Sequence, residues 1–107
     1  MSFIFENMIL YNVTIGIDKE IEQEWMAWVK NTHIPTVMKV GVFVDYKFYK
    51  VLTLDDEGSS SYCIQYFTPT INQFQQYLDG YAKSLIEEHH LKFKDRHVVF
   101  QTLLEEV

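Results

Sequence analysis

The chain has 107 residues, a formal net charge of −6 at pH 7 and 48% hydrophobic residues. This size and composition predict one globular domain over residues 1–107 with a modest buried core. The acidic balance disfavours a nucleic-acid partner or an anionic membrane surface, because both require attraction to phosphate. No apolar run approaches the roughly 20 residues that a membrane span needs.

The cysteine content and the N-terminus indicate a cytoplasmic protein. Cys63 is the only cysteine, so it forms no internal disulfide, as is typical of a reducing compartment. The first five residues are apolar but lack the positive flank and the cleavage site of a signal peptide. Regular alternation begins at Met8, which is an alternative start, and residues 1–7 are expected to form a loose leader.

The first half of the chain predicts a strand, a helix and a turn. Residues 8–17 carry apolar side chains at odd positions, which favours a strand, and Asp18 suits a helix N-cap. The buried stripe of this helix is expected to contain Ile21, Trp25, Trp28 and Val29. Pro35 lacks an N–H, so we expect the helix to break near His33. A second short helical turn, residues 36–39, can end at Gly41, because glycine readily adopts the left-handed conformation.

The second half begins with a hairpin. Residues 42–52 and 61–67 are rich in Val, Ile, Phe and Tyr and flank an acidic Gly-Ser loop, which predicts two antiparallel strands. Thr70 and Gln73 form a capping box for a second helix. This helix is expected to end near His90. Its buried stripe should contain Phe74, Tyr77, Leu78, Tyr81 and Leu85, followed by His89 or Leu91. Residues 98–104 alternate again and predict the last strand.

These elements predict an α+β fold of ferredoxin-like type, βαββαβ, with a four-stranded antiparallel sheet and both helices on one face. The first and third strands should be central. The face towards the helices is expected to carry Tyr11, Val13, Val44, Tyr46, Phe48, Ile64, Phe100 and Thr102. The other face is expected to carry Leu10, Asn12, Thr14, Phe43, Asp45, Lys47, Tyr49, Val51, Cys63, Gln65, Phe67, Val99, Gln101 and Leu103. Half of this second set is large and apolar, so we expect a homodimer through the open sheet face.

Polar side chains on the same predicted face indicate a partly wet space between two sheets. Asn12, Tyr49, Gln65 and Gln101 would be costly in a dry interface unless they are paired. One interpretation is that they hydrogen-bond across the interface. The other is that they bind an apolar or aromatic small molecule between the sheets.

Isolated polar residues give weaker functional signals. His33 is the candidate catalytic residue, because a histidine at a broken helix end can act as a general base. The alternative, which we favour, is that it caps free carbonyls there. Glu87 and His90 share a helical face, but two ligands make a poor metal site and no metal is expected. Arg96 either clamps an anion or neutralises the acidic surface. Cys63 is interpreted as a buried small hydrophobe.

From Met8 onward the chain resembles the dimeric α+β barrel superfamily, most closely its short members of unknown function. The likeness rests on the opening strand at residues 8–14, Trp25-Met26-Ala27-Trp28, His33-Ile34-Pro35, Gly41-Val42-Phe43 and the closing residues 100–105. It implies two sheets packed into a barrel but no single activity. Haem-degrading members pair a first-strand Asn with a Trp and a His. Asn12 fits, but both Trp residues lie on the first helix, so no cofactor is expected.

Three functional hypotheses follow. The chain is a small homodimeric binding protein, a non-catalytic structural or protein-interaction module, or a small monooxygenase- or isomerase-like enzyme. An internal cavity with a titratable group favours binding or catalysis, whereas a closed interior favours the module. Tyr62 and Tyr66 resemble the stacking aromatics of RNA-binding domains, but the acidic charge and the missing basic start of that strand oppose this function.

Overall fold

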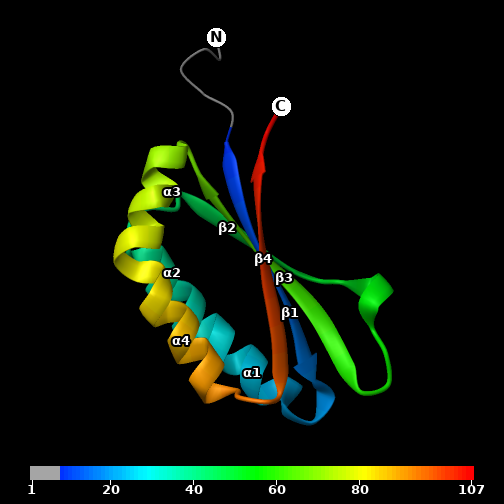
Figure 1. The fold of residues 1–107 in the computed structure, drawn as a ribbon. Coiled ribbons are helices and arrows are strands. Elements are labelled where there is room, and N and C mark those ends of the chain that lie inside the picture. The colour runs from blue at the N-terminus through cyan, green and yellow to red at the C-terminus, as the bar shows by residue number, and fades with distance from the viewer. Residues whose placement is uncertain (1–7) are drawn as a thin grey trace.

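The computed structural model describes residues 8–107, which form one four-stranded antiparallel sheet with helices against one face (Figure 1). The strands are β1 (Ile9–Asp18), β2 (Asp45–Lys50), β3 (Ser59–Thr68) and β4 (His97–Glu105). Their order is β2-β3-β1-β4, so β1 and β3 are central, as the sequence predicts. The ferredoxin-like βαββαβ prediction is confirmed. The predicted leader, residues 1–7, lies outside the described residues.

Two helical connections cover the sheet, and each has a π-helical turn in its middle. The first contains η1 (Lys19–Ile21), α1 (Glu22–Trp28), η2 (Val29–His33) and α2 (Ile34–Lys39). The second contains α3 (Ile71–Tyr77), η4 (Leu78–Ala82) and α4 (Lys83–Lys92), while η3 (Leu52–Leu54) lies between β2 and β3. Within residues 8–107, no helix combines the length and the apolar character needed to cross a membrane.

The predicted helix break near His33 is wrong. The Ile34 N–H bonds to the Val29 carbonyl, five residues back, and the helix continues into α2. Pro35 then lies in the first turn of α2, where its missing N–H costs little. The π turn therefore absorbs the proline and leaves His33 inside a continuous helix rather than at its end.

The second helix shows the same effect on its buried stripe. Phe74, Tyr77 and Leu85 are buried as predicted, but Leu78 and Tyr81 are exposed. The π turn η4 inserts an extra residue into the helical repeat, so the stripe moves to Ala82 and His89. The buried positions expected for a regular helix are therefore displaced by one residue across residues 78–82.

Two turn predictions are confirmed. Gly41 has a positive φ of 87°, a conformation that favours glycine because it has no Cβ. The Gln73 backbone N–H donates to Thr70 Oγ1 at 3.1 Å, which caps α3. The turn at Gly41 leads from α2 to β2 and the turn at Thr70 leads from β3 to α3, at the same end of the sheet (Figure 1).

The core between helices and sheet is largely aromatic. Trp25 is fully buried, and its ring centroid lies 5.1 Å from that of Tyr62 and 6.0 Å from that of Phe48. Aromatic pairs at such distances attract each other beyond the effect of area burial alone. Trp28, predicted to lie against the sheet, is half-buried and packs edge-on against Phe93 beside α4. The first helix is thus anchored to the sheet by Trp25 and to the second helix by Trp28.

The register of β4 reverses the faces predicted for that strand. Gln101 pairs with Val13 across the β1–β4 ladder, and directly opposed residues point to the same side of a sheet. Gln101 therefore faces the helices, together with Val99 and Leu103. Phe100 and Thr102, predicted to face the helices, point to the open side. Large residues occur at both alternate sets of positions in this strand, so the sequence pattern alone does not select a face.

The predicted faces are also reversed just before β2. Phe43 was expected on the open face but is buried, with its ring centroid 5.1 Å from that of Tyr66. Val44 was expected to face the helices and is exposed. Both residues precede the first ladder residue, Asp45, so the period of two does not apply to them.

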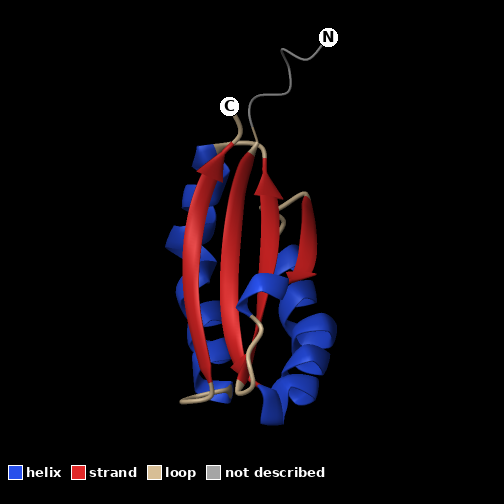
Figure 2. Ribbon diagram, turned by 90° about the vertical axis from the view of Figure 1, so that its right-hand side faces the viewer, coloured by secondary structure: helices blue, strands red, loops and turns tan. Residues whose placement is uncertain are grey.

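The second sheet face carries neither of the two helical connections (Figure 2). Its cross-strand rows, read from β4 to β2, are Leu104-Leu10-Phe67-Asp45, Thr102-Asn12-Gln65-Lys47 and Phe100-Thr14-Cys63-Tyr49. We call these twelve side chains the open face. The β2–β3 connection, residues 51–58, projects from the sheet on this side (Figure 1).

Candidate functional site

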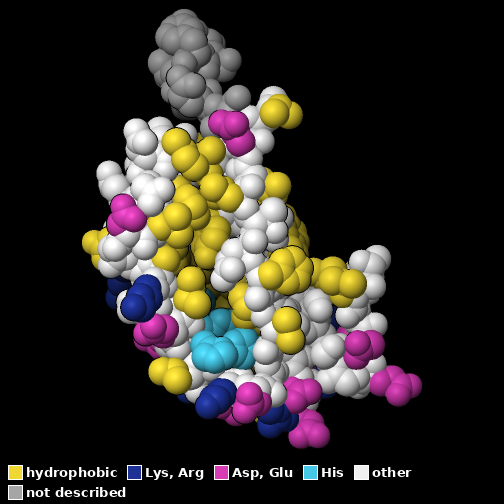
Figure 3. Space-filling view, in the orientation of Figure 1, with side chains coloured by type: hydrophobic (Ala, Val, Ile, Leu, Met, Phe, Trp, Pro, Cys, Tyr) yellow, Lys and Arg dark blue, Asp and Glu magenta, His cyan; other side chains and the backbone are white. Residues whose placement is uncertain are grey.

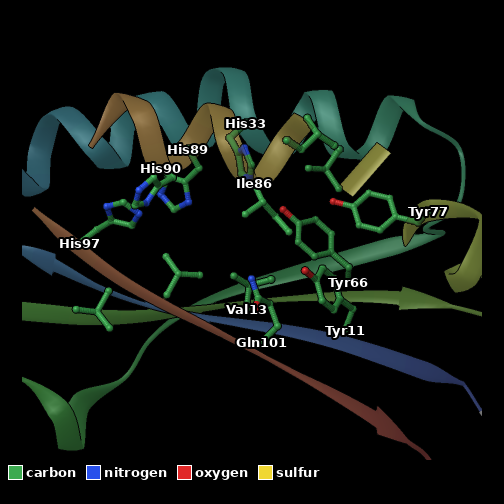
Figure 4. Close-up of a pocket in the computed structure, with 14 residues that line it drawn as sticks. Tyr11, Val13, His33, Tyr66, Tyr77, Ile86, His89, His90, His97 and Gln101 are labelled. Atoms are coloured by element: carbon green, nitrogen blue, oxygen red, sulfur yellow. The ribbon is translucent and has the colours of Figure 1, made fainter. Parts of the chain in front are cut away.

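A cavity of about 360 Å³ lies between the helices and the sheet. Its lining comes from three strands and from both helical connections, as Figure 4 shows. The lining residues are Tyr11, Val13, His33, Val37, Tyr66, Tyr77, Leu85, Ile86, His89, His90, His97, Val98, Val99 and Gln101. This volume lies within the range of roughly 300–1,000 Å³ that small-molecule sites occupy.

All four histidines of the chain line one end of this cavity. The His89 ring centroid lies 5.4 Å from that of His33 and 4.9 Å from that of His97, and the centroids of His90 and His97 are 5.4 Å apart. In the space-filling view they form one patch at the end of an apolar furrow (Figure 3). The sequence singled out His33 but missed this cluster, because its members come from η2, α4 and β4.

His33 comes from the π turn η2 and contributes an uncharged imidazole to the cavity. The Trp28 ring stacks on it with a centroid separation of 4.9 Å. Burial lowers the pKa of His33 to about 4, and its Nδ1 atom is buried without a hydrogen-bond partner. A neutral imidazole can accept or donate a hydrogen bond, but with this pKa it is a weak base at neutral pH.

His89 is also uncharged and is held by a tryptophan. Trp25 Nε1 donates a hydrogen bond to His89 Nε2 at 3.0 Å, and both side chains are buried. Burial lowers the pKa of His89 to about 3, with a further contribution from the neighbouring histidines. Because a cation here would lose solvation, the neutral form is strongly favoured.

Three tyrosines line the opposite end, with their hydroxyl groups directed towards the histidines (Figure 4). Burial raises the pKa of Tyr11 to about 12 and raises the pKa values of Tyr66 and Tyr77 well above the usual range. The Tyr66 hydroxyl is buried and has no hydrogen-bond partner. All three phenols stay protonated at neutral pH, and the lining contains no Asp, Glu, Lys or Arg.

The four residues predicted to line a ligand site lie on opposite faces of the sheet. Asn12 and Gln65 are direct partners across β1 and β3, and Tyr49 lies two residues along on the same open face. The Asn12 amide donates to Thr14 Oγ1 at 3.0 Å. Gln101 faces the other way and lines the cavity. The ligand-binding role of the open-face residues stays a prediction.

The surroundings of the remaining candidate residues favour structural roles over chemical ones. Arg96 pairs with Asp18 and with Glu20, which holds the start of β4 against the end of β1. Burial raises the pKa of the Cys63 thiol, which disfavours the nucleophilic thiolate. Among residues 8–107, no group of three or more His, Cys, Asp or Glu side chains has the geometry of a metal site.

The fold and cavity place the chain in the class of ferredoxin-like α+β proteins. Three solved structures resemble it across most of both chains. A conserved protein from Methanosarcina mazei Go1 has a TM-score of 0.70 and 14% identity, with 100% of each chain covered. A dimeric ferredoxin-like protein from an uncultured marine organism has a TM-score of 0.66 and 10% identity, covering 95% of this chain and 97% of that one. SnoaB, a cofactor-independent oxygenase from Streptomyces nogalater, has a TM-score of 0.64 and 12% identity, with 90% of each chain covered.

The particular family is defined by sequence. Residues 8–107 match the family DUF4286, a domain of unknown function, and the chain belongs to this family. No protein of curated function matches the chain. At identities of 10–14%, the likeness to the solved structures above establishes the fold and no activity.

Proposed function

We propose that this protein binds an uncharged apolar or aromatic small molecule in the cavity between its own helices and sheet. The observation that carries the proposal is the pair of unpartnered buried atoms, His33 Nδ1 and the Tyr66 hydroxyl, on residues that line the same cavity. A buried polar atom without a partner costs about 1–3 kcal/mol. A ligand that supplies the missing hydrogen bonds removes this cost.

The electrostatics of the lining define the charge of the ligand. The imidazoles of His33 and His89 and the three phenols are neutral, and neither a carboxylate nor an ammonium or guanidinium group lines the space. An ion moved into such a site would lose its hydration without gaining a counter-charge. The aromatic lining, by contrast, suits a flat apolar body. The sequence predicts a ligand between two sheets, whereas the site proposed from the cavity lies on the helix side of one sheet.

A small monooxygenase- or isomerase-like reaction is the second candidate. The likeness in fold to SnoaB, a cofactor-independent oxygenase, and the presence of an imidazole in the cavity favour it. His33 could accept a proton only from a ligand of considerable acidity, since its pKa is about 4. Incubating each bound compound with the protein in air, and analysing products by mass spectrometry, separates turnover from binding.

We also propose that two copies associate through the open face. Leu10, Phe67, Leu104 and Phe100 give this face an apolar character that monomers seldom leave in water. The β2–β3 connection extends beyond it and carries Leu52, which is 79% exposed. Such a projecting segment can contact a second copy placed on the open face. Light scattering at micromolar concentration should then give twice the mass of one chain.

Two further predictions, on nucleic acid and on location, rest on the sequence alone. The net charge of −6 supports the prediction that no nucleic acid binds. The lone Cys63 supports the prediction of a cytoplasmic location. The hypothesis of a structural or protein-interaction module is less favoured, because a packed interior would be expected of it.

The cavity is tested by a binding screen that uses the protein's own tryptophans. Trp25 and Trp28 contact the cavity histidines, so a bound ligand should alter their fluorescence and raise the melting temperature. His33→Ala should weaken binding of any compound found, whereas Asn12→Ala, an equivalent truncation on the open face, should leave it unchanged. The reverse result would place the ligand between the sheets of two copies.

A further inference from the structure

The hydrogen bond from Trp25 fixes the tautomer of His89. An indole N–H can only donate, so the Nε2 atom that it contacts at 3.0 Å must carry the lone pair. The proton of the neutral imidazole is therefore on Nδ1. His89 lines the cavity with this N–H left as a hydrogen-bond donor.

The neighbouring His97 has the same tautomer but leaves the opposite kind of group free. His97 Nδ1 lies 2.6 Å from the Phe93 carbonyl oxygen, and a carbonyl oxygen can only accept. In neutral His97 the proton is therefore on Nδ1, and Nε2 carries the lone pair. This second imidazole lines the same end of the cavity with a hydrogen-bond acceptor.

The two rings that carry these groups are neighbours. The ring centroids of His89 and His97 are 4.9 Å apart with an angle of 35° between the ring planes, and no hydrogen bond joins the two side chains. One ring comes from α4 and the other from the start of β4, as Figure 4 shows. The cavity thus combines an apolar, aromatic body with a donor and an acceptor on two adjacent rings at one end.

We propose that the cavity selects uncharged, flat ligands that carry a hydrogen-bond acceptor beside a donor, as a lactam, a pyridone or another cyclic amide does. The ligand carbonyl would accept from His89 Nδ1, and the ligand N–H would donate to His97 Nε2. This inference rests on the proposed binding function and names its ligand class. Trp25 is a positioning residue, because it determines which nitrogen of His89 carries the proton.

The selectivity follows from the groups left unpaired by the wrong ligand. A hydrocarbon of the same shape leaves both imidazole nitrogens without partners, and an acceptor-only heterocycle satisfies one of them at most. A carboxylate has no donor for His97 and brings a charge into a neutral site. Sites built around specific hydrogen bonds reject analogues that lack them far more strongly than apolar pockets reject differences in size.

Isothermal titration at pH 8 with four bicyclic probes tests the inference. The probes are 2-quinolone (acceptor and donor), quinoline (acceptor only), naphthalene (neither) and quinoline-2-carboxylate (anion). We expect 2-quinolone to bind at least about tenfold more tightly than quinoline or naphthalene, and the carboxylate to bind most weakly. Equal affinities for 2-quinolone and naphthalene would overturn the inference and leave the proposed binding function intact. No binding by any probe would count against both.

Two further measurements isolate the role of Trp25. Trp25→Phe keeps an aromatic ring but removes the N–H, so the preference for 2-quinolone over naphthalene should fall several-fold while naphthalene binding persists. Trp28→Phe, a matched change on a residue that stacks on His33 and His89 instead of donating a hydrogen bond to them, should keep the preference. If Trp25→Phe does not fold, the ¹⁵N shifts of the imidazoles in the unaltered protein decide. A proton on Nε2 of His89 or of His97 would refute the assignment.

Discussion

The two faces of the sheet have opposite surroundings. On the helix side, Tyr66 and His33 are enclosed, neutral and partly unpartnered around a cavity. On the open face, Asn12 and Tyr49 lie among exposed apolar side chains and keep access to water. On the helix side, burial lowers the pKa values of His33 and His89. We expect substitutions on the two faces to differ in what they change: stability and ligand binding on the first, association on the second.

The largest effect is expected in the covered core. Trp25→Ala removes a fully buried ring together with its hydrogen bond to His89, and should lower the free energy of unfolding by about 3–5 kcal/mol. Trp28→Ala, at a half-buried position, should cost clearly less. Urea unfolding of both variants measures the difference. Equal losses would show that the two tryptophans do not divide the anchoring as the structure implies.

The open face should respond through the oligomeric state. Phe100 is 55% exposed in one chain, and Phe100→Glu would place a charge in the proposed interface. We expect the dimer dissociation constant to rise at least about 100-fold, because an unpaired charge in an interface costs several kcal/mol. Leu91→Glu, at a 72% exposed position on α4, is the control and should leave association unchanged. Sedimentation velocity distinguishes them. A Phe100→Glu variant as dimeric as the parent would remove the open face from the interface.

The buried histidines predict a loss of stability in acid. Burial lowers the folded-state pKa of His33 to about 4 and that of His89 to about 3, whereas an unfolded histidine has a pKa of about 6.5. Below pH 6.5 the unfolded chain binds more protons, so stability is fully present above that pH and falls as the pH drops towards 4. Each histidine can contribute up to about 1.4 kcal/mol per pH unit in this window.

A histidine substitution connects this behaviour to the cavity. His33→Phe removes one titrating group, so the decline between pH 6.5 and pH 4 should become shallower. His90→Gln, at an exposed position, serves as the control and should retain the steep decline. Urea unfolding at a series of pH values measures both slopes. Identical slopes for His33→Phe and the parent would contradict a buried, neutral His33.

The smallest expected effect is the difference in stability between removing the hydroxyl group of Tyr66 and that of Tyr49. Tyr66→Phe removes a buried hydroxyl that has no partner and should raise the stability of the ligand-free protein by about 1 kcal/mol. Tyr49→Phe makes the same chemical change on the open face and should stay within about 0.5 kcal/mol of the parent. Differential scanning calorimetry of the two variants is sufficient. Destabilisation by Tyr66→Phe would mean that this hydroxyl is satisfied in solution.

Local chemistry in the sequence determined the elements of this protein. Alternating residues determined the strands, the side chain of Thr70 determined where α3 begins, and the backbone freedom of Gly41 determined the turn before β2. The order of the strands followed from the handedness of the two connections. Each of these features depends on neighbours in the chain, so each could be predicted without coordinates.

Only the tertiary structure decided the faces and the site. A π turn in each helical connection changed which residues are buried or helical. In the first connection the helix continues through Pro35, and in the second the buried position moves from Tyr81 to Ala82. Pairing with β1 chose the face of Gln101 in a strand that is apolar on both sides. The histidine cluster joins residues up to 64 positions apart, as the bond from Trp25 to His89 illustrates. Sequence periodicity describes one element at a time, whereas a cavity depends on how separate elements pack.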